Sequence, residues 1–179
     1  NAIRILKKNP PKQWDDIPAQ RRPNLWDTSL RVPTAIRWPG TIDPGTVHRQ
    51  TFSNLDWFPT LLAMAGIKPG RQLELRGEDF TPILTGKTSR WDPDIYLQYS
   101  MKHGAITHMR GVRTPNWKLM IDLQHQGRVE MYDLQHDPHE RLNLATSDSG
   151  NHQDQLKQLK HMVKSHMQSI GDPLLEMFP

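Results

Sequence analysis

The sequence predicts a mixed α/β chain that ends in a small antiparallel sheet packed by a C-terminal helix. Apolar, β-branched runs follow one another after Trp91, and only short turns separate them, which is typical of an antiparallel meander. Apolar side chains then recur at helical spacing near the C-terminus, where Gly171 can end the helix. Because strand and helix patterns also precede Trp91, we expect two parts, residues 1–90 and residues 91–179.

The first part opens with an irregular basic segment. Residues 1–24 hold several prolines and many Lys and Arg residues without an apolar period, which predicts a loop. Leu30–Trp38 then reads as a strand that the Pro39-Gly40 turn closes, and Val47–Phe52 as a second strand. Pro33 restricts the first strand to its own end or to a sheet edge.

The best helix pattern of the first part is Asp56–Ala65. Asp56 can cap its start, Pro59 falls in the first turn, and Gly66 can supply a left-handed residue after the end. A short helical turn is predicted at Asp79–Leu84. One face of the longer helix is apolar and spaced for packing on a sheet, and it consists of Phe58, Leu61, Leu62 and Ala65.

The second part consists of four predicted strands and the last helix. In the third strand Trp117, Leu119 and Ile121 fall on one face, while Lys118 and Met120 fall on the other. The strands are Ile95–Tyr99, Ile106–Arg113, Trp117–Asp122 and Arg128–Leu134. The helical stripe is Leu156, Leu159, Met162, Val163, Met167 and Ile170.

Composition narrows the functional classes. The chain has no cysteine, which excludes disulfides, thiolate metal sites and cysteine nucleophiles within it. Its net charge is +4 and its basic residues are dispersed among acidic ones, which does not favour nucleic acid as the partner. The same charge balance suits a small anionic substrate or a sulfated glycan. The apolar run Leu61–Ile67 is too short for a membrane span, so we expect none.

Five segments, in this order, resemble the sulfatase family. Asn24–Gly40 (NLWDTSLRVPTAIRWPG) resembles the family's acidic residue, Arg-Val-Pro and strand ending in Trp-Pro-Gly. Four later segments resemble the family's elements that follow. They are Asp56–Gly66 for the next helix, Gly77–Gly86 for a turn, Val112–Leu119 for the C-terminal strand pair and Met131–Leu144 for the closing tyrosine/aspartate turn. Together they cover most of the chain from Asn24 to Ala145.

The resemblance implies an alkaline-phosphatase-like α/β fold, of which this chain would be the C-terminal part. Sulfatases use a formylglycine made within a C/S-x-P-S/A-R motif and a calcium ion held by Asp and Asn or His residues. This chain has no such motif. We therefore expect the nucleophile and the calcium ligands upstream, the complete protein to degrade a sulfated polysaccharide, and this chain alone to be inactive. By family analogy the compartment is periplasmic or extracellular.

Two alternatives stay open. A phosphodiester or phosphonate ester hydrolase of the same superfamily would share the fold and differ in the upstream nucleophile. A catalytically silent module that binds sulfated glycans would share the surface and lack the nucleophile. The sequence upstream of residue 1 discriminates among the three hypotheses.

Cations are needed against the negative charge that develops in sulfate ester cleavage. The resemblance implies a lysine shortly before the Arg-Val-Pro segment, and Arg21 and Arg22 occupy the nearest place, with Arg22 the candidate for a catalytic cation. Arginine can bind sulfate oxygens with two hydrogen bonds but is a poor proton donor. Lys7, Lys8 and Lys12 are weaker candidates, and the family's lysine could also directly precede Asn1.

Further polar side chains are candidates for substrate or metal contacts. His103 and His108 flank a short loop and are candidates for contacts to a sugar hydroxyl or sulfate, against the alternative of surface histidines. Asp27 and Arg31 are expected to form a structural ion pair. The cluster His136, Asp137, His139 and Glu140 looks like a metal site, but its Asp-Pro turn makes the side chains diverge, so we expect a solvated turn and no metal bound by this chain.

Overall fold

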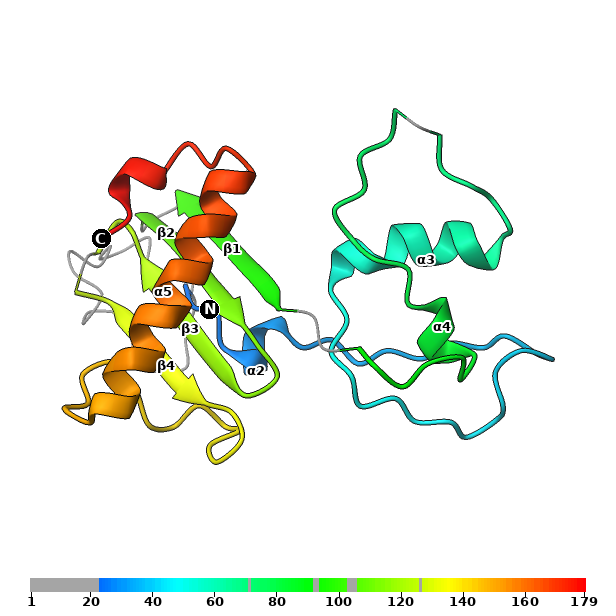
Figure 1. Cartoon of the computed structure of the whole chain (residues 1–179), viewed down its shortest axis with the longest axis horizontal. Coiled ribbons are helices and arrows are strands. Elements are labelled where there is room, and N and C mark those ends of the chain that lie inside the picture. Colours follow the sequence, from blue (N-terminus) through cyan, green and yellow to red (C-terminus); the bar gives the residue numbers. More distant parts are fainter. Residues whose placement is uncertain (1–22, 71, 92–93, 103–105, 126) are drawn as a thin grey trace. The chain divides into compact units, whose positions relative to one another are not determined.

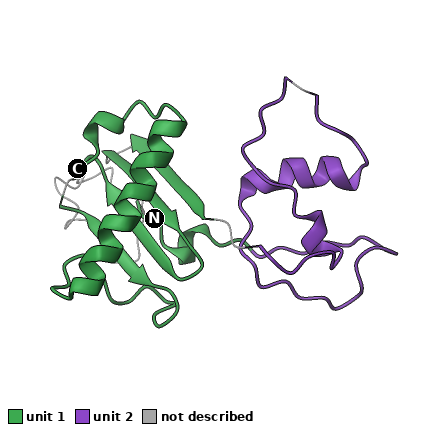
Figure 2. Cartoon of the chain, viewed as in Figure 1, with its two compact units in different colours: residues 1–32, 94–179 green, residues 33–93 purple. Residues whose placement is uncertain are grey.

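The computed structural model describes residues 23–70, 72–91, 94–102, 106–125 and 127–179 (Figure 1). The chain divides into two compact units (Figure 2). Unit 1 contains the described residues up to Val32 and the segment Asp94–Pro179. Unit 2 contains Pro33–Pro93. The short stretch before Val32 thus belongs with the C-terminal sheet and not with the residues that follow it in sequence.

Unit 1 is built on a four-stranded antiparallel sheet with the strand order β1-β2-β3-β4. The strands are β1 (Ile95–Lys102), β2 (Ile106–Arg113), β3 (Trp117–Asp122) and β4 (Val129–Asp133). Each pairs with its neighbour in sequence, as in Leu119 opposite Val112 and Met131 opposite Leu119. The predicted meander is confirmed, with β1 three residues longer than expected at its end.

Helix α5 (Gly150–Ser169) lies across one face of this sheet (Figure 1). Its residues Leu159, Val163 and Met167 are fully buried and pack against Leu119 and Ile121 of β3. The predicted stripe therefore does form the packing face, and Gly171 follows it with a φ of +62°. This is the larger apolar core of unit 1.

The opposite face of the sheet has a core of its own. Met109 of β2, Met120 of β3 and Tyr132 of β4 are buried there together with Leu25, which comes from the segment before Val32. Short helix α2 (Asp27–Leu30) begins two residues after Leu25. Strand residues alternate between the two faces, so the predicted alternation along β3 is confirmed.

Unit 2 contains the short 3-10 helix η2 (Asn54–Asp56), α3 (Trp57–Met64) and α4 (Thr81–Leu84). Ser53 and Asp56 form a capping box, in which Asp56 Oδ2 accepts from the Ser53 N–H at 2.7 Å. Phe80 is fully buried, and its ring stacks on Phe52 at 4.3 Å. The predicted helix and helical turn are thus confirmed, with Gly66 left-handed at a φ of +68°.

Two strand predictions in the first half of the chain are wrong. Among the described residues, Leu30–Trp38 and Val47–Phe52 contribute no strand; the first begins at the end of α2 and continues in irregular conformation. A strand exists only through hydrogen bonds to a neighbouring strand, and the sheet of unit 1 has no member from these residues. Val32 and Val47 are accordingly 71% and 74% exposed. The β-propensity of these residues predicted an extended strand, but it does not specify a neighbouring strand to pair with.

The prediction that the apolar face of α3 packs on a sheet is also wrong. Phe58 and Leu61 are 51% and 53% exposed, and Ala65 is exposed as well. The side of α3 that is buried instead carries Thr60, whose hydroxyl accepts from the Phe80 N–H at 3.0 Å. In the described part of the chain, no helix has both the length and the apolar character to cross a membrane.

Gly111 is required by close approach of two strands. A Cβ at this position would lie 2.3 Å from the Leu119 carbonyl oxygen, while one at Gly150 would meet nothing within 4 Å. We expect Gly111→Ala to lower the free energy of unfolding by about 1–3 kcal/mol, because backbone has to move. Gly150→Ala, at the start of α5, should leave it unchanged or slightly higher. Urea unfolding of both variants checks this, and equal effects would contradict it.

The exposed apolar side chains of unit 2 predict self-association of the 179-residue chain by itself. Val47, Leu55 and Ile67 add to Phe58 and Leu61, all more than half exposed. We expect the isolated chain to bind a hydrophobic dye and to elute as more than a monomer. The double variant Phe58→Ser/Leu61→Ser should reduce both signals. A monomeric chain without dye binding would contradict the prediction.

Candidate functional site

A buried ionic network lies on the sheet face opposite α5. The Lys118 ammonium, fully buried, donates to Asp27 Oδ1 at 2.8 Å and to Glu140 Oε1 at 2.6 Å. The Arg113 guanidinium lies 3.5 Å from Asp27. Two cations thus face two carboxylates, which satisfies the charge balance that burial demands. The network joins α2, β2, β3 and the turn after β4.

The charges in this network determine the state of Asp27. Burial by itself raises the pKa of a carboxyl group, but Lys118 and Arg113 more than offset burial and hold the Asp27 pKa below its usual value. Asp27 therefore stays ionised at neutral pH. Its carboxylate anchors the start of α2 to Lys118 of β3.

Glu140 reaches the network through an unusual backbone conformation. Its φ of +54° is the sole positive value at a non-glycine residue in the described ranges. This conformation brings one carboxylate oxygen to Lys118 and the other to the backbone N–H of Asp27, at 2.7 Å. The strained residue thus fixes the start of α2 from the turn after β4.

A second buried group, centred on Glu130 of β4, holds the residues before α2. Glu130 Oε2 accepts from Trp26 Nε1 at 2.7 Å and from the Tyr132 hydroxyl at 2.7 Å, and Oε1 accepts from Arg128 Nε at 3.1 Å. Arg128 Nη2 donates to the Pro23 carbonyl at 2.8 Å. Burial, followed by the neighbouring Glu130 carboxylate, raises the pKa of Tyr132 far above its usual value, so its hydroxyl remains a donor.

A third buried polar group is centred on Asp122, at the end of β3, which accepts several hydrogen bonds. Its carboxylate accepts from the Thr107 hydroxyl at 2.6 Å and from the His108 N–H at 3.1 Å, and it lies 2.9 Å from His125 Nδ1. Burial raises the Asp122 pKa, but these hydrogen bonds outweigh it and lower the value overall. Arg128 Nη1 lies 3.9 Å away, so Arg128 stands between this group and Pro23.

The face covered by α5 carries one buried ion pair. Arg110 Nε donates to Asp172 Oδ2 at 2.6 Å, and the Tyr96 hydroxyl donates to the same oxygen at 3.2 Å. Hydrogen bonding from Arg110 is the main cause of the lowered Asp172 pKa. This pair joins β2 to the residues after α5 and makes no contact with the segment before α2 that the structure describes.

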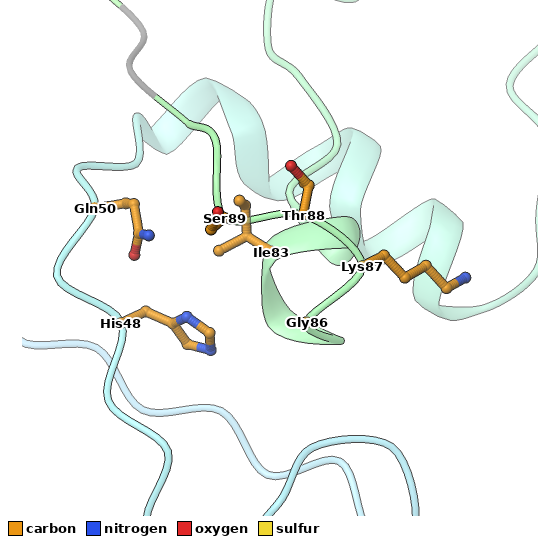
Figure 3. A pocket seen from close by; sticks show the side chains of 7 residues that line it. All are labelled: His48, Gln50, Ile83, Gly86, Lys87, Thr88 and Ser89. Carbon is orange, nitrogen blue, oxygen red and sulfur yellow. The ribbon is translucent and has the colours of Figure 1, made fainter.

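Unit 2 has a polar cavity of about 520 Å³ (Figure 3). His48 and Gln50 line it, and their Nε2 and Oε1 atoms are buried without a hydrogen-bond partner. Lys87 also belongs to the lining, but Figure 3 shows its side chain extending away from His48. The cavity has room for a small polar group.

Most of the chain matches one known protein family. The family described as N-sulphoglucosamine sulphohydrolase, C-terminal, matches residues 20–169 of the chain, which include all three groups on the sheet face opposite α5. The chain belongs to the sulfatase family. The resemblance of five segments to sulfatases is thereby confirmed.

Individual relatives are similar over part of their length. Human arylsulfatase A is 30% identical over 159 residues, which cover 76% of this chain and 30% of that protein. The N-acetylglucosamine-6-O-sulfatase of Bacteroides thetaiotaomicron is 30% identical over 126 residues, which cover 67% of this chain and 22% of that protein. Rat steryl-sulfatase is 22% identical over 83% of this chain and 30% of its own. The sulfatase chain thus spans 30% or less of these relatives.

Solved structures agree in fold. A 2-O GAG sulfatase is 27% identical with a TM-score of 0.56, over 65% of this chain and 25% of that one. A protein in complex with its substrate D-glucosamine-2-N,6-O-disulfate is 24% identical with a TM-score of 0.61, over 76% of this chain and 28% of that one. The predicted fold, the C-terminal part of the alkaline-phosphatase-like α/β fold of sulfatases, is confirmed.

Some of the predicted site residues of this sulfatase chain are not among the residues that the structure describes. Arg21, Arg22 and His103 lie outside the described residues, as do the weaker lysine candidates of the N-terminal segment. His108 is described and lies in β2, where its Nδ1 is buried without a hydrogen-bond partner. Arg22 directly precedes Pro23, the residue that Arg128 contacts.

The expected ion pair between Asp27 and Arg31 is wrong. Asp27 pairs with Lys118 and Arg113, and Arg31 contacts it only through a backbone hydrogen bond of 2.8 Å to the Asp27 carbonyl. Asp27 begins α2 with its side chain directed at the sheet, so a partner four residues along the chain cannot compete with the buried ammonium of Lys118.

The residues of the suspected metal cluster after β4 separate. Asp137 accepts from the backbone N–H groups of Arg141 and Leu142, while His136 lies 2.8 Å from Asp133. Glu140 belongs to the Lys118 network. In the ranges that the structure describes, no three His, Asp or Glu side chains could together hold a metal ion.

Sequence reasoning missed the residues that hold the segment before α2. Lys118, Arg128 and Glu130 were part of predicted strands, and no role was assigned to their charges. The sequence did hold a signal for these residues, namely a charged residue among apolar neighbours in a strand. A charge buried in this way requires an opposite charge or a hydrogen-bond partner, so the pattern predicts an ion pair. The partners Asp27 and Glu140 are distant in sequence, and only the fold reveals them.

The lowered pKa of Asp27 predicts a pH-dependent contribution to stability. A folded pKa below the unfolded value gives stability that is present above about pH 4 and is lost as pH falls through the folded value. Asp27→Asn should therefore lower the free energy of unfolding by about 3 kcal/mol at neutral pH and by less at about pH 3, where part of the contribution is already lost. Denaturant unfolding at both pH values measures this.

Asp154→Asn is the matched control, because Asp154 pairs with Lys157 on the exposed side of α5. We expect little change at either pH for this variant. An Asp27→Asn penalty that is the same at both pH values would show that packing, not charge, accounts for the effect.

Proposed function

We propose that this chain is the C-terminal part of a sulfatase that hydrolyses sulfate esters of a sulfated carbohydrate. The observation that carries the proposal is the anchored segment Pro23–Leu30, which the family match includes and which directly follows Arg22. Relatives named as an N-acetylglucosamine-6-O-sulfatase and a 2-O GAG sulfatase support carbohydrate as the substrate class. A complex with D-glucosamine-2-N,6-O-disulfate supports a sulfated amino sugar in particular.

The chain's own contribution in this proposal is to bind and orient the substrate. Arg22, with Arg21 beside it, binds sulfate oxygens and stabilises the negative charge that increases as the S–O bond breaks. His103 and His108 bind sugar hydroxyls or a second sulfate.

The nucleophile and the metal lie elsewhere in this proposal. Within the described ranges no side chains fit a calcium ion, and the chain has neither cysteine nor a C/S-x-P-S/A-R motif. Formylglycine and calcium therefore belong to the part of the protein upstream of this chain. Since the chain covers 30% or less of its curated relatives, there is ample length for both.

The activity of the full-length protein tests the proposal. We expect release of inorganic sulfate from 6-O-sulfated or N-sulfated glucosamine, little hydrolysis of an aryl phosphodiester, and no turnover by residues 1–179 alone. Ion chromatography measures the sulfate. Faster phosphodiester hydrolysis would favour the alternative hydrolase of the superfamily. Binding of the sulfated sugar without turnover would favour the non-catalytic module.

A further inference from the structure

We propose that strand β1 pairs antiparallel with β1 of a second copy of this chain, so that the two sheets join edge to edge. The inference is independent of the proposed function, because it concerns an interaction surface and not the sulfatase site. It rests on the outward backbone groups of β1, on its lack of edge protection, and on the positions of Asp94 and Lys102.

The sheet of unit 1 has two edges, and the chain itself occupies the one at β4. The Asn143 side chain accepts from the Met131 N–H and donates to the Val129 carbonyl, both at 3.0 Å. The Leu144 N–H donates to the Met131 carbonyl at 2.8 Å. Beyond β1, at the other edge, the described part of the chain contributes no further strand (Figure 1). The two edges of the sheet therefore differ in cover.

The hydrogen-bond pattern shows which residues of β1 direct their backbone groups toward the open edge. The Leu123 N–H, just after β3, donates to the His108 carbonyl at 2.8 Å, so even-numbered residues of β2 face β3 and odd-numbered ones face β1. Odd-numbered residues of β2 lie opposite odd-numbered residues of β1. The N–H and C=O groups of Tyr96, Gln98 and Ser100 therefore point away from β2.

Strand β1 also lacks the features that commonly prevent edge-to-edge pairing. Edge strands are often short, bulged, interrupted by proline or supplied with inward charges. Strand β1 has eight residues, as many as β2, and its register with β2 is unbroken from Ile95 to Lys102. It contains no proline, and its one charged residue is Lys102 at the last position. Such an edge is suited to pairing with another strand.

Charge favours one register between the two copies. When Gln98 lies opposite its own counterpart, Asp94 of each copy lies opposite Lys102 of the other, and both residues are exposed. A shift by two residues places Asp94 opposite Ser100 in one direction and Lys102 opposite Tyr96 in the other. Opposite charges on directly facing residues stabilise an antiparallel pair, so the register centred on Gln98 is preferred.

The odd-numbered side chains of β1 form apolar pairs in the same register. Ile95 lies opposite Met101 of the other copy, and Leu97 lies opposite Tyr99. In each copy Leu97 and Tyr99 pack against the core that contains Met109. Apolar and aromatic cross-strand pairs stabilise a sheet, so the second copy extends this core across the edge.

The absence of cysteine from the chain allows a site-specific test by single cysteine variants of the 179-residue chain. Facing Cα atoms of a hydrogen-bonded antiparallel pair lie about 5.5 Å apart, within disulfide range, so Gln98→Cys should form a covalent dimer on mild oxidation. The two copies of Ser100 are offset by about four residues, or about 14 Å, so the control Ser100→Cys should stay monomeric on a non-reducing gel. Association through unit 2 does not discriminate between these two positions.

Exchange of the two charges tests the register. Added to Gln98→Cys, Lys102→Asp should lower the yield of covalent dimer about fivefold, because carboxylates then face each other at both ends of the strand pair. The further substitution Asp94→Lys restores opposite charges. It should return the yield to within about twofold of Gln98→Cys alone.

Each outcome decides the proposal. It is overturned if Gln98→Cys gives no covalent dimer, if Ser100→Cys cross-links equally, or if exchanging the charges does not restore the yield. If a variant does not fold, the wild-type chain supplies the measurement, because exchange of the Tyr96, Gln98 and Ser100 amides should slow as protein concentration rises. Exchange that is independent of concentration would also refute the pairing. None of these readouts depends on sulfate release.

Discussion

The buried ammonium of Lys118 is the interaction on which unit 1 depends. It is fully buried between Asp27 and Glu140, which come from a segment before the sheet and from a turn after it. Removal of any one of the three charges would leave an uncompensated charge in the interior, which is among the more costly changes a folded chain can undergo. The ammonium therefore requires α2 to return to the sheet, although residues 33–93 separate the two in sequence.

This requirement explains why the sheet is buried on both faces. A small antiparallel sheet can expose one of its faces to water. With α5 covering one face, this sheet could therefore have left the opposite face exposed. Here Leu25 and Trp26 cover the second face, and the side chains beneath them carry charges as well as apolar groups. Helix α5 provides burial, while the segment before α2 is placed by directional bonds. Apolar packing thus predominates on the face covered by α5, and buried hydrogen-bonded charges predominate on the opposite face.

The sequence predicts correctly those elements that are stabilised by local interactions or by pairing with the next strand in sequence. The meander, α3 and α5 follow from periodicity and turns, and Gly66 and Gly171 end their helices as expected, whereas Asp56 accepts from Ser53 and Glu78 and does not cap α3. The strand predictions at Leu30–Trp38 and Val47–Phe52 are wrong, because a strand needs a partner that its own sequence does not specify. The same limit applied to the site. The charge of Lys118 was visible in the sequence, but its partners lie 91 and 22 residues away.

The exposed surfaces of unit 2 follow from the same argument. Val47, Phe58 and Leu61 are apolar residues of predicted packing elements, yet each is more than half exposed. In unit 1, by contrast, every predicted strand found its neighbour within the chain. The wrong predictions are therefore concentrated where the required contacts are non-local. The sequence carries β-propensity there for a partner that unit 1 does not provide.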